Sequence, residues 1–224
     1  YGQQYIDNTW NYFDPATGAQ VKNTFMNLNG KRVYYDYLGH RAHGQQKINN
    51  IWYYFDESTG NLAKGYVWVS AQNKEIYCDN QGHLVFGSQY IDNKWTYFDP
   101  TTGAQAKNVF VELGSKKVYY DYLGHMVYGQ QNINGHYYYF DDKTGAMTTG
   151  YKWIWYQNKE VYYNNQGQML YGEQKIDNRW TYFDPWTGAQ AKNRFIYLGG
   201  SHKTVYYDGN GYLVYGQQKI NNHW

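Results

Sequence analysis

Three kinds of side chain that can bind a neutral sugar recur along this chain about every 43 residues. A sugar presents apolar C–H faces that stack on aromatic rings, and hydroxyls that need hydrogen-bond donors and acceptors. Most repeats offer a ring, an amide and a cation. We therefore predict a repeated sugar site with these residues: Tyr37, Gln46, Trp52, Lys64, Gln89, Trp95, Lys107, Tyr122, Gln131, Tyr137, Gln174, Trp180 and Lys192. Thr149 stands where the fourth repeat would carry its lysine, which predicts a weaker or missing site there.

Each of these residue types also has a structural interpretation, and the sequence leaves both open. The tryptophans fit a core or a pocket wall, and the glutamines could bond to a neighbouring strand edge or backbone. The lysines could be solvated charges that keep sheet edges from pairing. A tyrosine two residues before an Asp or Asn occurs in all ten half-repeats, as at Tyr12 and Tyr34, and this regularity favours packing.

Catalysis and metal binding find little support in the sequence. Aspartates such as Asp14 and Asp56 recur in Phe-Asp-x-x-Thr-Gly segments, where bonding of the side chain to the backbone of a turn is the ordinary role. A glycosidase needs two carboxylates in unlike environments, and a ladder of equivalent aspartates provides no such pair. His40 and His43 form an isolated pair without a third ligand. We predict no catalytic residue, no metal and no cofactor.

Composition excludes further classes of function. Aromatic residues make up 21% of the chain although its mean hydropathy is −0.88, so the core must be built from amphipathic rings. Such aromatic richness argues against disorder. The 20 Lys and Arg nearly balance the 18 Asp and Glu and form no basic stripe, which argues against a nucleic-acid partner. No apolar stretch approaches the roughly 20 residues that span a bilayer, so we expect no membrane insertion.

The repeat itself defines the elements that position these residues. Repeats begin near residues 2, 44, 87, 129, 172 and 216, each with a Gly-x-Gln sequence. Alternate repeats are most alike, because Gly65-Tyr66-Val67-Trp68 returns 85 residues later as Gly150-Tyr151-Lys152-Trp153. A fixed period of this size predicts one array over residues 1–224, in which each repeat packs on its neighbours. Because the sequence begins and ends inside repeats, we expect it to be a fragment of a longer protein.

Each repeat contains two half-repeats that predict short hairpins. Aromatic and polar residues alternate in Trp10-Asn11-Tyr12, so both rings share one face of a strand. Asp7-Asn8 and Asn134-Gly135 precede such strands and tolerate the positive φ of tight hairpin turns. A lone hairpin is marginal in water, whereas stacked hairpins bury their aromatic faces. We predict an all-β fold, a β-solenoid of about ten stacked short hairpins with no significant helix.

The pattern resembles the cell-wall and glucan-binding repeats at the C-terminus of streptococcal and lactic-acid-bacterial glucansucrases. The run Gly129-Gln-Gln-Asn-Ile133-Asn-Gly-His-Tyr-Tyr-Tyr-Phe140-Asp is the best example, and the resemblance covers the whole chain. It implies a β-solenoid that binds α-glucans such as dextran in pockets between neighbouring units. Choline-binding repeats of the same superfamily carry a Gly-Trp dipeptide at the start of each unit, and this chain has none.

Three hypotheses follow. The first is a non-catalytic carbohydrate-binding module for α-glucan, secreted or attached to a bacterial cell surface. Its parent would be a glucansucrase, with its catalytic domain outside this chain, or a glucan-binding surface protein. The second is a choline-binding cell-wall anchor, which would need a cage of aromatic rings around a quaternary ammonium. The third is a structural stalk or protein-adhesion repeat. In each case, exposed sheet edges could let the fragment associate with itself.

Overall fold

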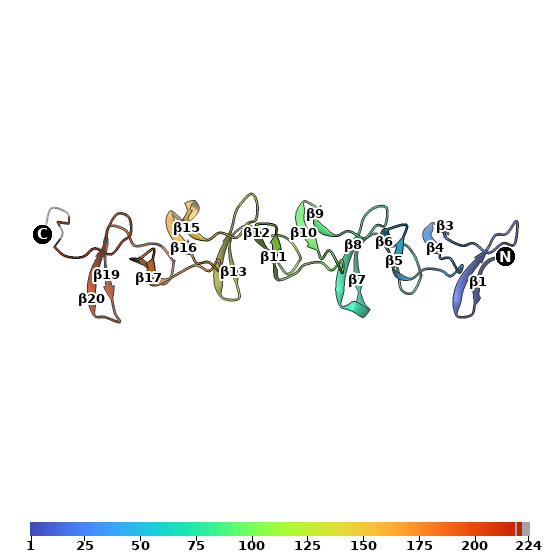
Figure 1. The fold of residues 1–224 in the computed structure, drawn as a ribbon, viewed down its shortest axis with the longest axis horizontal. Coiled ribbons are helices and arrows are strands. Elements are labelled where there is room, and N and C mark those ends of the chain that lie inside the picture. Colours follow the sequence, from blue (N-terminus) through green and yellow to red (C-terminus); the bar gives the residue numbers. More distant parts are fainter. Residues whose placement is uncertain (218, 221–224) are drawn as a thin grey trace. The chain divides into compact units, whose positions relative to one another are not determined.

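The computed structural model describes residues 1–217 and 219–220, which form ten antiparallel two-stranded hairpins (Figure 1). In chain order the hairpins are β1 (Gly2–Ile6) with β2 (Thr9–Phe13), β3 (Thr24–Leu28) with β4 (Lys31–Tyr35), β5 (Gly44–Ile48) with β6 (Ile51–Phe55), β7 (Gly65–Val69) with β8 (Lys74–Cys78), β9 (Gly87–Ile91) with β10 (Lys94–Phe98), β11 (Val109–Leu113) with β12 (Lys116–Tyr120), β13 (Gly129–Ile133) with β14 (His136–Phe140), β15 (Gly150–Ile154) with β16 (Lys159–Tyr163), β17 (Gly172–Ile176) with β18 (Arg179–Phe183), and β19 (Arg194–Leu198) with β20 (Lys203–Tyr207).

Helix is confined, in this described part of the chain, to two three-residue 3₁₀ turns, η1 (Ser70–Gln72) and η2 (Trp155–Gln157). Neither has the length or apolar character that a helix needs to cross a bilayer. The predicted all-β solenoid of about ten hairpins is confirmed. Gln218 and residues 221–224, in the repeat that begins near residue 216, lie outside the described residues.

The hairpin turns have the backbone that their residues predict. Asp7 and Asn8 adopt φ of 49° and 61°, and Asn134 and Gly135 adopt 51° and 83°. Consecutive positive φ values match the twist of the flanking strands, and Asn, Asp and Gly tolerate them best. The sequence therefore fixes the register of each strand pair locally, with Ile6 opposite Thr9 in the first hairpin.

The core runs along one face of every second strand. In β10, Thr96 and Phe98 are fully buried, whereas Trp95, which precedes them, is 42% exposed. The residue just before each loop Asp or Asn is the most deeply buried ring in most hairpins: Tyr35, Phe55, Phe98, Tyr120, Phe140, Tyr163, Phe183 and Tyr207. The tyrosines of the ten-fold pattern, one position earlier, are half-buried or buried, in agreement with a packing role. Cys78 replaces a ring in the buried row, and burial raises the pKa of its thiol to about 12.

The loop aspartates close tight turns, as their sequence context predicts. Asp56 Oδ1 accepts bonds from the Thr59 backbone N–H and the Thr59 hydroxyl, both at 2.7 Å, and from the Ser58 hydroxyl at 2.8 Å. These hydrogen bonds hold the pKa of Asp56 at about 2. The same bonds lower the pKa of Asp14, Asp99, Asp141 and Asp184.

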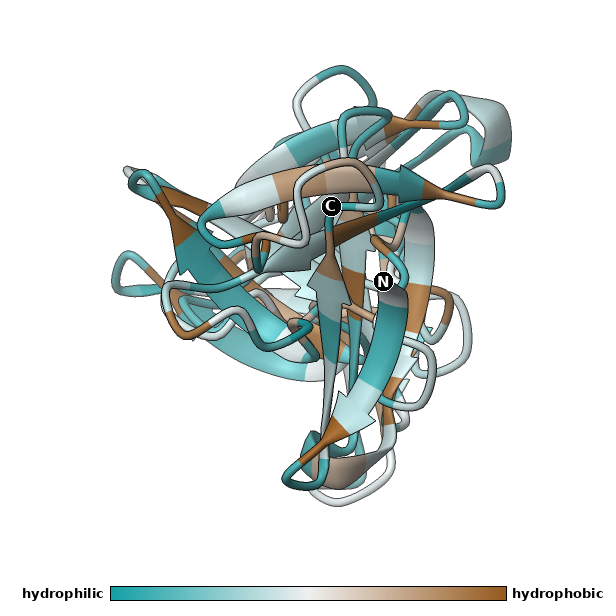
Figure 2. Cartoon of the chain, turned by 90° about the vertical axis from the view of Figure 1, so that its right-hand side faces the viewer, coloured by the Kyte–Doolittle hydropathy of each residue, from teal (hydrophilic) through white to brown (hydrophobic). Residues whose placement is uncertain are grey.

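The chain divides into two compact units. Unit 1 contains Tyr1–Val109 and Tyr120–His125, and unit 2 contains Phe110–Tyr119 and Met126–Trp224. Within a unit, each hairpin packs a ring on the previous one: Phe55 lies 6.3 Å from Phe25 in unit 1, and Phe183 lies 6.2 Å from Tyr162 in unit 2. Hydrophobic and hydrophilic segments alternate along individual hairpins (Figure 2), as strands with two unlike faces require.

Candidate functional site

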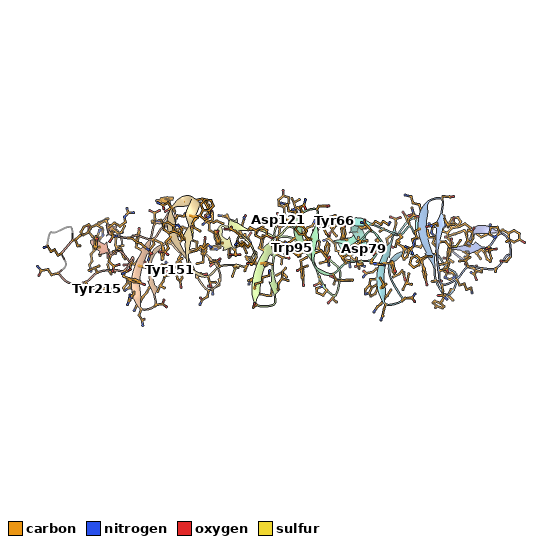
Figure 3. The ribbon with its side chains drawn as sticks, turned by 90° about the horizontal axis from the view of Figure 1, so that it is seen from above. Tyr66, Asp79, Trp95, Asp121, Tyr151 and Tyr215 are labelled. Atoms are coloured by element: carbon orange, nitrogen blue, oxygen red, sulfur yellow. The ribbon has the colours of Figure 1, made fainter. Side chains whose placement is uncertain are left out.

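One face of the β7–β8 hairpin combines an exposed indole with a carboxylate. Trp68 lies opposite Glu75, and Tyr66 lies opposite Tyr77, so these four side chains share a face. Trp68 is 56% exposed. This face is turned towards the next hairpin, because Phe98 of β10 packs 6.5 Å from Tyr66 and 6.2 Å from Tyr77. Tyr66 is labelled in Figure 3.

The connector that follows β10 brings a cation to the carboxylate. Lys107 Nζ lies 2.5 Å from Glu75 Oε2, and the Gln105 backbone N–H donates to the Glu75 carbonyl at 2.8 Å. Two contacts with the same residue therefore fix the connector against β8. The predicted Lys107 therefore pairs with the cross-strand neighbour of Trp68, an indole that the sequence analysis did not select.

Gln89 belongs to the same side of the structure. It lies opposite Thr96 and shares a face with Phe98, which packs on β7–β8. Its Nε2 donates to the Phe86 carbonyl at 2.8 Å. We call the set Trp68, Glu75, Gln89 and Lys107 seam 1, and it lies within unit 1.

Unit 2 contains the same arrangement 85 residues later. Trp153 lies opposite Glu160, and Lys192 Nζ lies 2.5 Å from Glu160 Oε2. The Glu160 carbonyl accepts the Gln190 N–H at 2.8 Å, as Glu75 does with Gln105. Tyr151, labelled in Figure 3, packs on Phe183 of the next hairpin. We call Trp153, Glu160, Gln174 and Lys192 seam 2.

Two other hairpins of the second half-repeats, β3–β4 and β11–β12, lack this combination of indole, carboxylate and lysine. On β3–β4, Asn27 and Arg32 occupy the positions of Trp68 and Glu75, so the connector lysine Lys64 faces no carboxylate at the equivalent position. On β11–β12, Glu112 and Lys117 pair with each other at 3.3 Å.

Thr149 follows β13–β14, at the position where the connectors after β6, β10 and β18 carry lysine, and the weaker site there stays a prediction. Lys64 instead lines a cleft of about 360 Å³ in unit 1, together with Tyr54, Asn61 and Val67. The Asp56 loop forms another wall of this cleft.

The four predicted glutamines each form a hydrogen bond to nearby backbone. Each donates its amide N–H to the carbonyl three residues earlier: Gln46 to His43 at 2.8 Å, Gln89 to Phe86 at 2.8 Å, Gln131 to Tyr128 at 2.6 Å and Gln174 to Tyr171 at 2.6 Å. The bond to neighbouring backbone that the structural interpretation predicts is therefore present in all four. A sugar hydroxyl would bond to the amide oxygen or to the second amide N–H.

The predicted rings of the first half-repeats point away from their own glutamines. Trp52, Trp95, Tyr137 and Trp180 are 36–42% exposed, and each occupies the second position of its strand. Gln46 lies opposite Tyr53, the residue after Trp52, so Gln46 and Trp52 lie on opposite faces. Tyr37 and Tyr122 are 69% and 68% exposed in the loops that follow Asp36 and Asp121. The structure thus pairs Lys107 with Glu75 and Lys192 with Glu160, and places Gln46 and Trp52 of one repeat on opposite faces.

Several aromatic rings elsewhere already carry a cation of the chain itself. Arg32 lies 4.3 Å from the Phe25 ring centre, Lys152 lies 4.5 Å from that of Tyr139, and Arg179 lies 4.6 Å from that of Tyr212. Lys117 and Lys47 lie 5.3 Å and 5.7 Å from Phe110 and Trp52. A quaternary ammonium would have to displace these cations to stack on the same rings.

Trp68, Trp153, Glu75 and Glu160 are the residues that the sequence analysis missed. A signal for the tryptophans was present, because Gly-Tyr-x-Trp occurs twice, 85 residues apart. The two glutamates share that spacing, as do the lysines that they contact. Reading the 85-residue period as a shared site would have found all four.

Comparison with known proteins agrees with this architecture. A family model for the choline-binding repeat matches residues 26–66 and 148–195. No curated protein matches the sequence.

Among solved structures, CbpJ from Streptococcus pneumoniae has a TM-score of 0.70 and 21% identity, over 95% of this chain and 93% of that chain. CbpF in complex with ipratropium has a TM-score of 0.74 and 22% identity, over 92% and 76%. An alternansucrase in complex with isomaltononaose has a TM-score of 0.41 and 29% identity, over 95% and 16%. The fold is shared with CbpJ and CbpF, and the two segments that match the choline-binding repeat fit the resemblance to cell-wall and glucan-binding repeats.

Proposed function

We propose that the chain is a non-catalytic module that binds α-glucan at seam 1 and seam 2. The observation that carries this proposal is the repetition of one constellation, in which an exposed indole stands beside a Glu–Lys pair and a glutamine lies on the facing hairpin. Each constellation draws on two consecutive hairpins, so stacking itself assembles the site. The parent protein would be secreted or held at a bacterial cell surface.

The chemistry of the seams suits a neutral sugar. The indole offers an apolar face for sugar C–H groups, the carboxylate accepts hydrogen bonds from hydroxyls, and the ammonium donates them. Because the side chains of Glu75 and Lys107 balance each other, seam 1 carries no net charge. Burial raises the pKa of Tyr66, and that of Tyr151 to about 12, so these phenols stay protonated at neutral pH and can donate to a sugar oxygen.

Two weak sites can still retain a polymer. A single seam with millimolar affinity would contribute about −4 kcal/mol of binding free energy. Sites that bind one glucan together raise the overall avidity by roughly 10²–10⁴. The module would therefore hold a long polymer far more tightly than a short oligosaccharide, and its role would be to tether glucan.

Affinity electrophoresis in native gels cast with dextran tests this function. We expect dextran to retard the chain, Trp68→Ala and Trp153→Ala each to weaken the retardation, and the double variant to lose most of it. Trp95→Ala is the matched control, because Trp95 is similarly exposed but lies outside both seams. Failure of dextran to retard the unaltered chain would overturn the proposal. Retardation that needs Trp95 and neither seam tryptophan would move the site to the other faces of the hairpins.

Choline binding is the second candidate, and the match to the choline-binding repeat model at residues 26–66 and 148–195 favours it. Several exposed rings would be available to a quaternary ammonium. The two functions separate in the same gel when free choline is added. Dextran retardation that choline leaves unchanged supports the glucan module, whereas quenching of tryptophan fluorescence by choline without any dextran retardation supports the anchor.

A further inference from the structure

Seam 2 is bordered by three aromatic residues that seam 1 lacks. Ser70 and Ala71 begin the η1 turn beside seam 1, and the corresponding residues of η2 are Trp155 and Tyr156. In the connector after β18, Trp186 replaces the Thr101 of the connector after β10. Trp155 is 72% exposed and Trp186 is 91% exposed, which is far more than packing on the chain itself would leave.

The frame around these substitutions is the same in both units. Lys74 donates to the Thr102 carbonyl at 2.6 Å, and Lys159 donates to the Thr187 carbonyl at 2.5 Å. The residues that end the two turns, Asn73 and Asn158, both have φ of 48° and ψ of 47°. The two units therefore present one backbone arrangement with different side chains on it.

The extra tryptophans lie along the line of contacts that builds seam 2. Lys159 follows the turn that holds Trp155, and it bonds to Thr187, the neighbour of Trp186. The next residue, Glu160, forms the ion pair with Lys192 in the same connector. Both residues therefore adjoin, along the chain, the residues that hold β16 against the connector on which the Trp153 site is built.

The groups around the two rings are mostly neutral and polar, and the two charged ones are engaged by the chain itself. Gln157, Asn158 and Thr187 adjoin them in sequence and offer amides and a hydroxyl. The Lys159 ammonium is engaged by a carbonyl, and the Asp184 carboxylate is engaged by the Thr187 N–H and hydroxyl. Tyr156 packs edge-on against Trp155, with ring centres 5.7 Å apart, and supports its orientation. Exposed rings with amides nearby, and with the neighbouring ammonium and carboxylate of opposite sign, suit a neutral polysaccharide.

We propose that Trp155 and Trp186 extend seam 2 into a longer glucan-binding surface, so that seam 2 distinguishes long from short α-glucan segments and seam 1 does not. This inference rests on the proposed function. Seam 1 would hold a short segment at Trp68, because Ser70 and Thr101 offer no ring to further sugar residues. Seam 2 would hold a short segment at Trp153 and gain additional stacking as the segment lengthens.

Calorimetric titration with isomalto-oligosaccharides of graded length tests the inference. Trp68→Ala leaves only seam 2 intact, and Trp153→Ala leaves only seam 1. We expect the affinity of the Trp68→Ala variant to rise about tenfold from the shortest to the longest ligand, the scale of one or two ring contacts. The Trp153→Ala variant should show no such rise.

Two further variants identify the residues responsible. Trp155→Ala with Trp186→Ala, in the Trp68→Ala background, should abolish the dependence on length and keep the binding of short ligands. Ser70→Trp, Ala71→Tyr and Thr101→Trp together, in the Trp153→Ala background, should confer that dependence on seam 1. Both changes affect exposed positions, and near-ultraviolet circular dichroism checks that each variant is folded.

The outcomes separate the inference from the proposed function. Equal dependence on length at both seams, or a dependence that survives loss of Trp155 and Trp186, would overturn the inference alone. Binding of short ligands with no dependence on length at either seam would do the same. If no oligosaccharide of any length binds the unaltered chain, the proposed function fails and this inference fails with it.

Discussion

At the scale of single residues, the loop aspartates couple the stability of the fold to pH. The pKa of Asp56 is about 2 in the folded chain, below its ordinary value of 3.8, because Thr59 and Ser58 donate to the carboxylate. A carboxyl group whose pKa is lower in the folded than in the unfolded state stabilises the fold. This stabilisation is complete at a pH above the unfolded-state pKa, and it is lost as the pH falls through the folded-state pKa. We therefore expect the free energy of unfolding, measured by urea titration, to fall between about pH 4 and pH 2.

The variant Asp56→Asn isolates this contribution. Asn keeps an oxygen that accepts the same bonds, as Asn164 does from the backbone of Gln166 and Gln168, but it does not titrate. The fall in stability towards pH 2 should be shallower in this variant than in the unaltered chain. Asp7→Asn, in a hairpin turn, is the matched control. Identical slopes for Asp56→Asn and the unaltered chain would contradict the assignment.

At the scale of elements, a neighbouring side chain leaves room only for glycine at position 124, in the loop that follows β12. Gly124 has φ of +82°, and a Cβ there would lie 2.3 Å from Gln105 Nε2. That amide is itself held, because it donates to the Thr96 hydroxyl at 3.0 Å and to the Leu123 carbonyl at 3.4 Å. Gly114, in a hairpin turn, has φ of +62° with nothing within 4 Å of its Cβ position.

These two glycines separate backbone strain from steric conflict. Gly114→Ala should lower the free energy of unfolding by about 1 kcal/mol, the cost of a left-handed residue with a side chain. Gly124→Ala should cost roughly 2–4 kcal/mol, because it adds the loss of the hydrogen bonds that Gln105 donates to Thr96 and Leu123. Chemical denaturation of both variants measures the difference. Equal losses would show that Gln105 moves aside freely.

The elements also show how far the sequence can predict this protein. Turns, strands and loops were predictable because each depends on nearby residues, as Asn134-Gly135 and Asp56 illustrate. The grouping of site residues depends on which face of one hairpin meets the next. Alternation along a strand places Gln46 and Trp52 on opposite faces, so residues close in sequence are separated in space. Lys107 instead pairs with Glu75, the cross-strand neighbour of Trp68 in the preceding hairpin, and in the sequence only the 85-residue period indicated this relation.

At the scale of the whole molecule, stability should be local to each unit. In a repeat array, stability is approximately a sum of terms for single repeats and for contacts between neighbours. Phe55 is fully buried in unit 1 and packs with Ala42, Tyr53 and the partly buried Phe25. Phe183 is fully buried in unit 2 and contacts Tyr151 and Tyr162. Each ring therefore joins only hairpins that adjoin its own.

Replacing either ring by alanine should destabilise its surroundings by about 3–5 kcal/mol, as for other large-to-small core substitutions. For Phe55→Ala, we expect amide hydrogen exchange to accelerate from β3 to β8 and to stay near its original rate from β15 to β18. Phe183→Ala should give the converse pattern. Equal acceleration across both units in either variant would mean that the array unfolds as one cooperative body. In that case a substitution at seam 1 could disturb seam 2 through stability alone, so the exchange pattern also decides whether single-seam variants report on single sites.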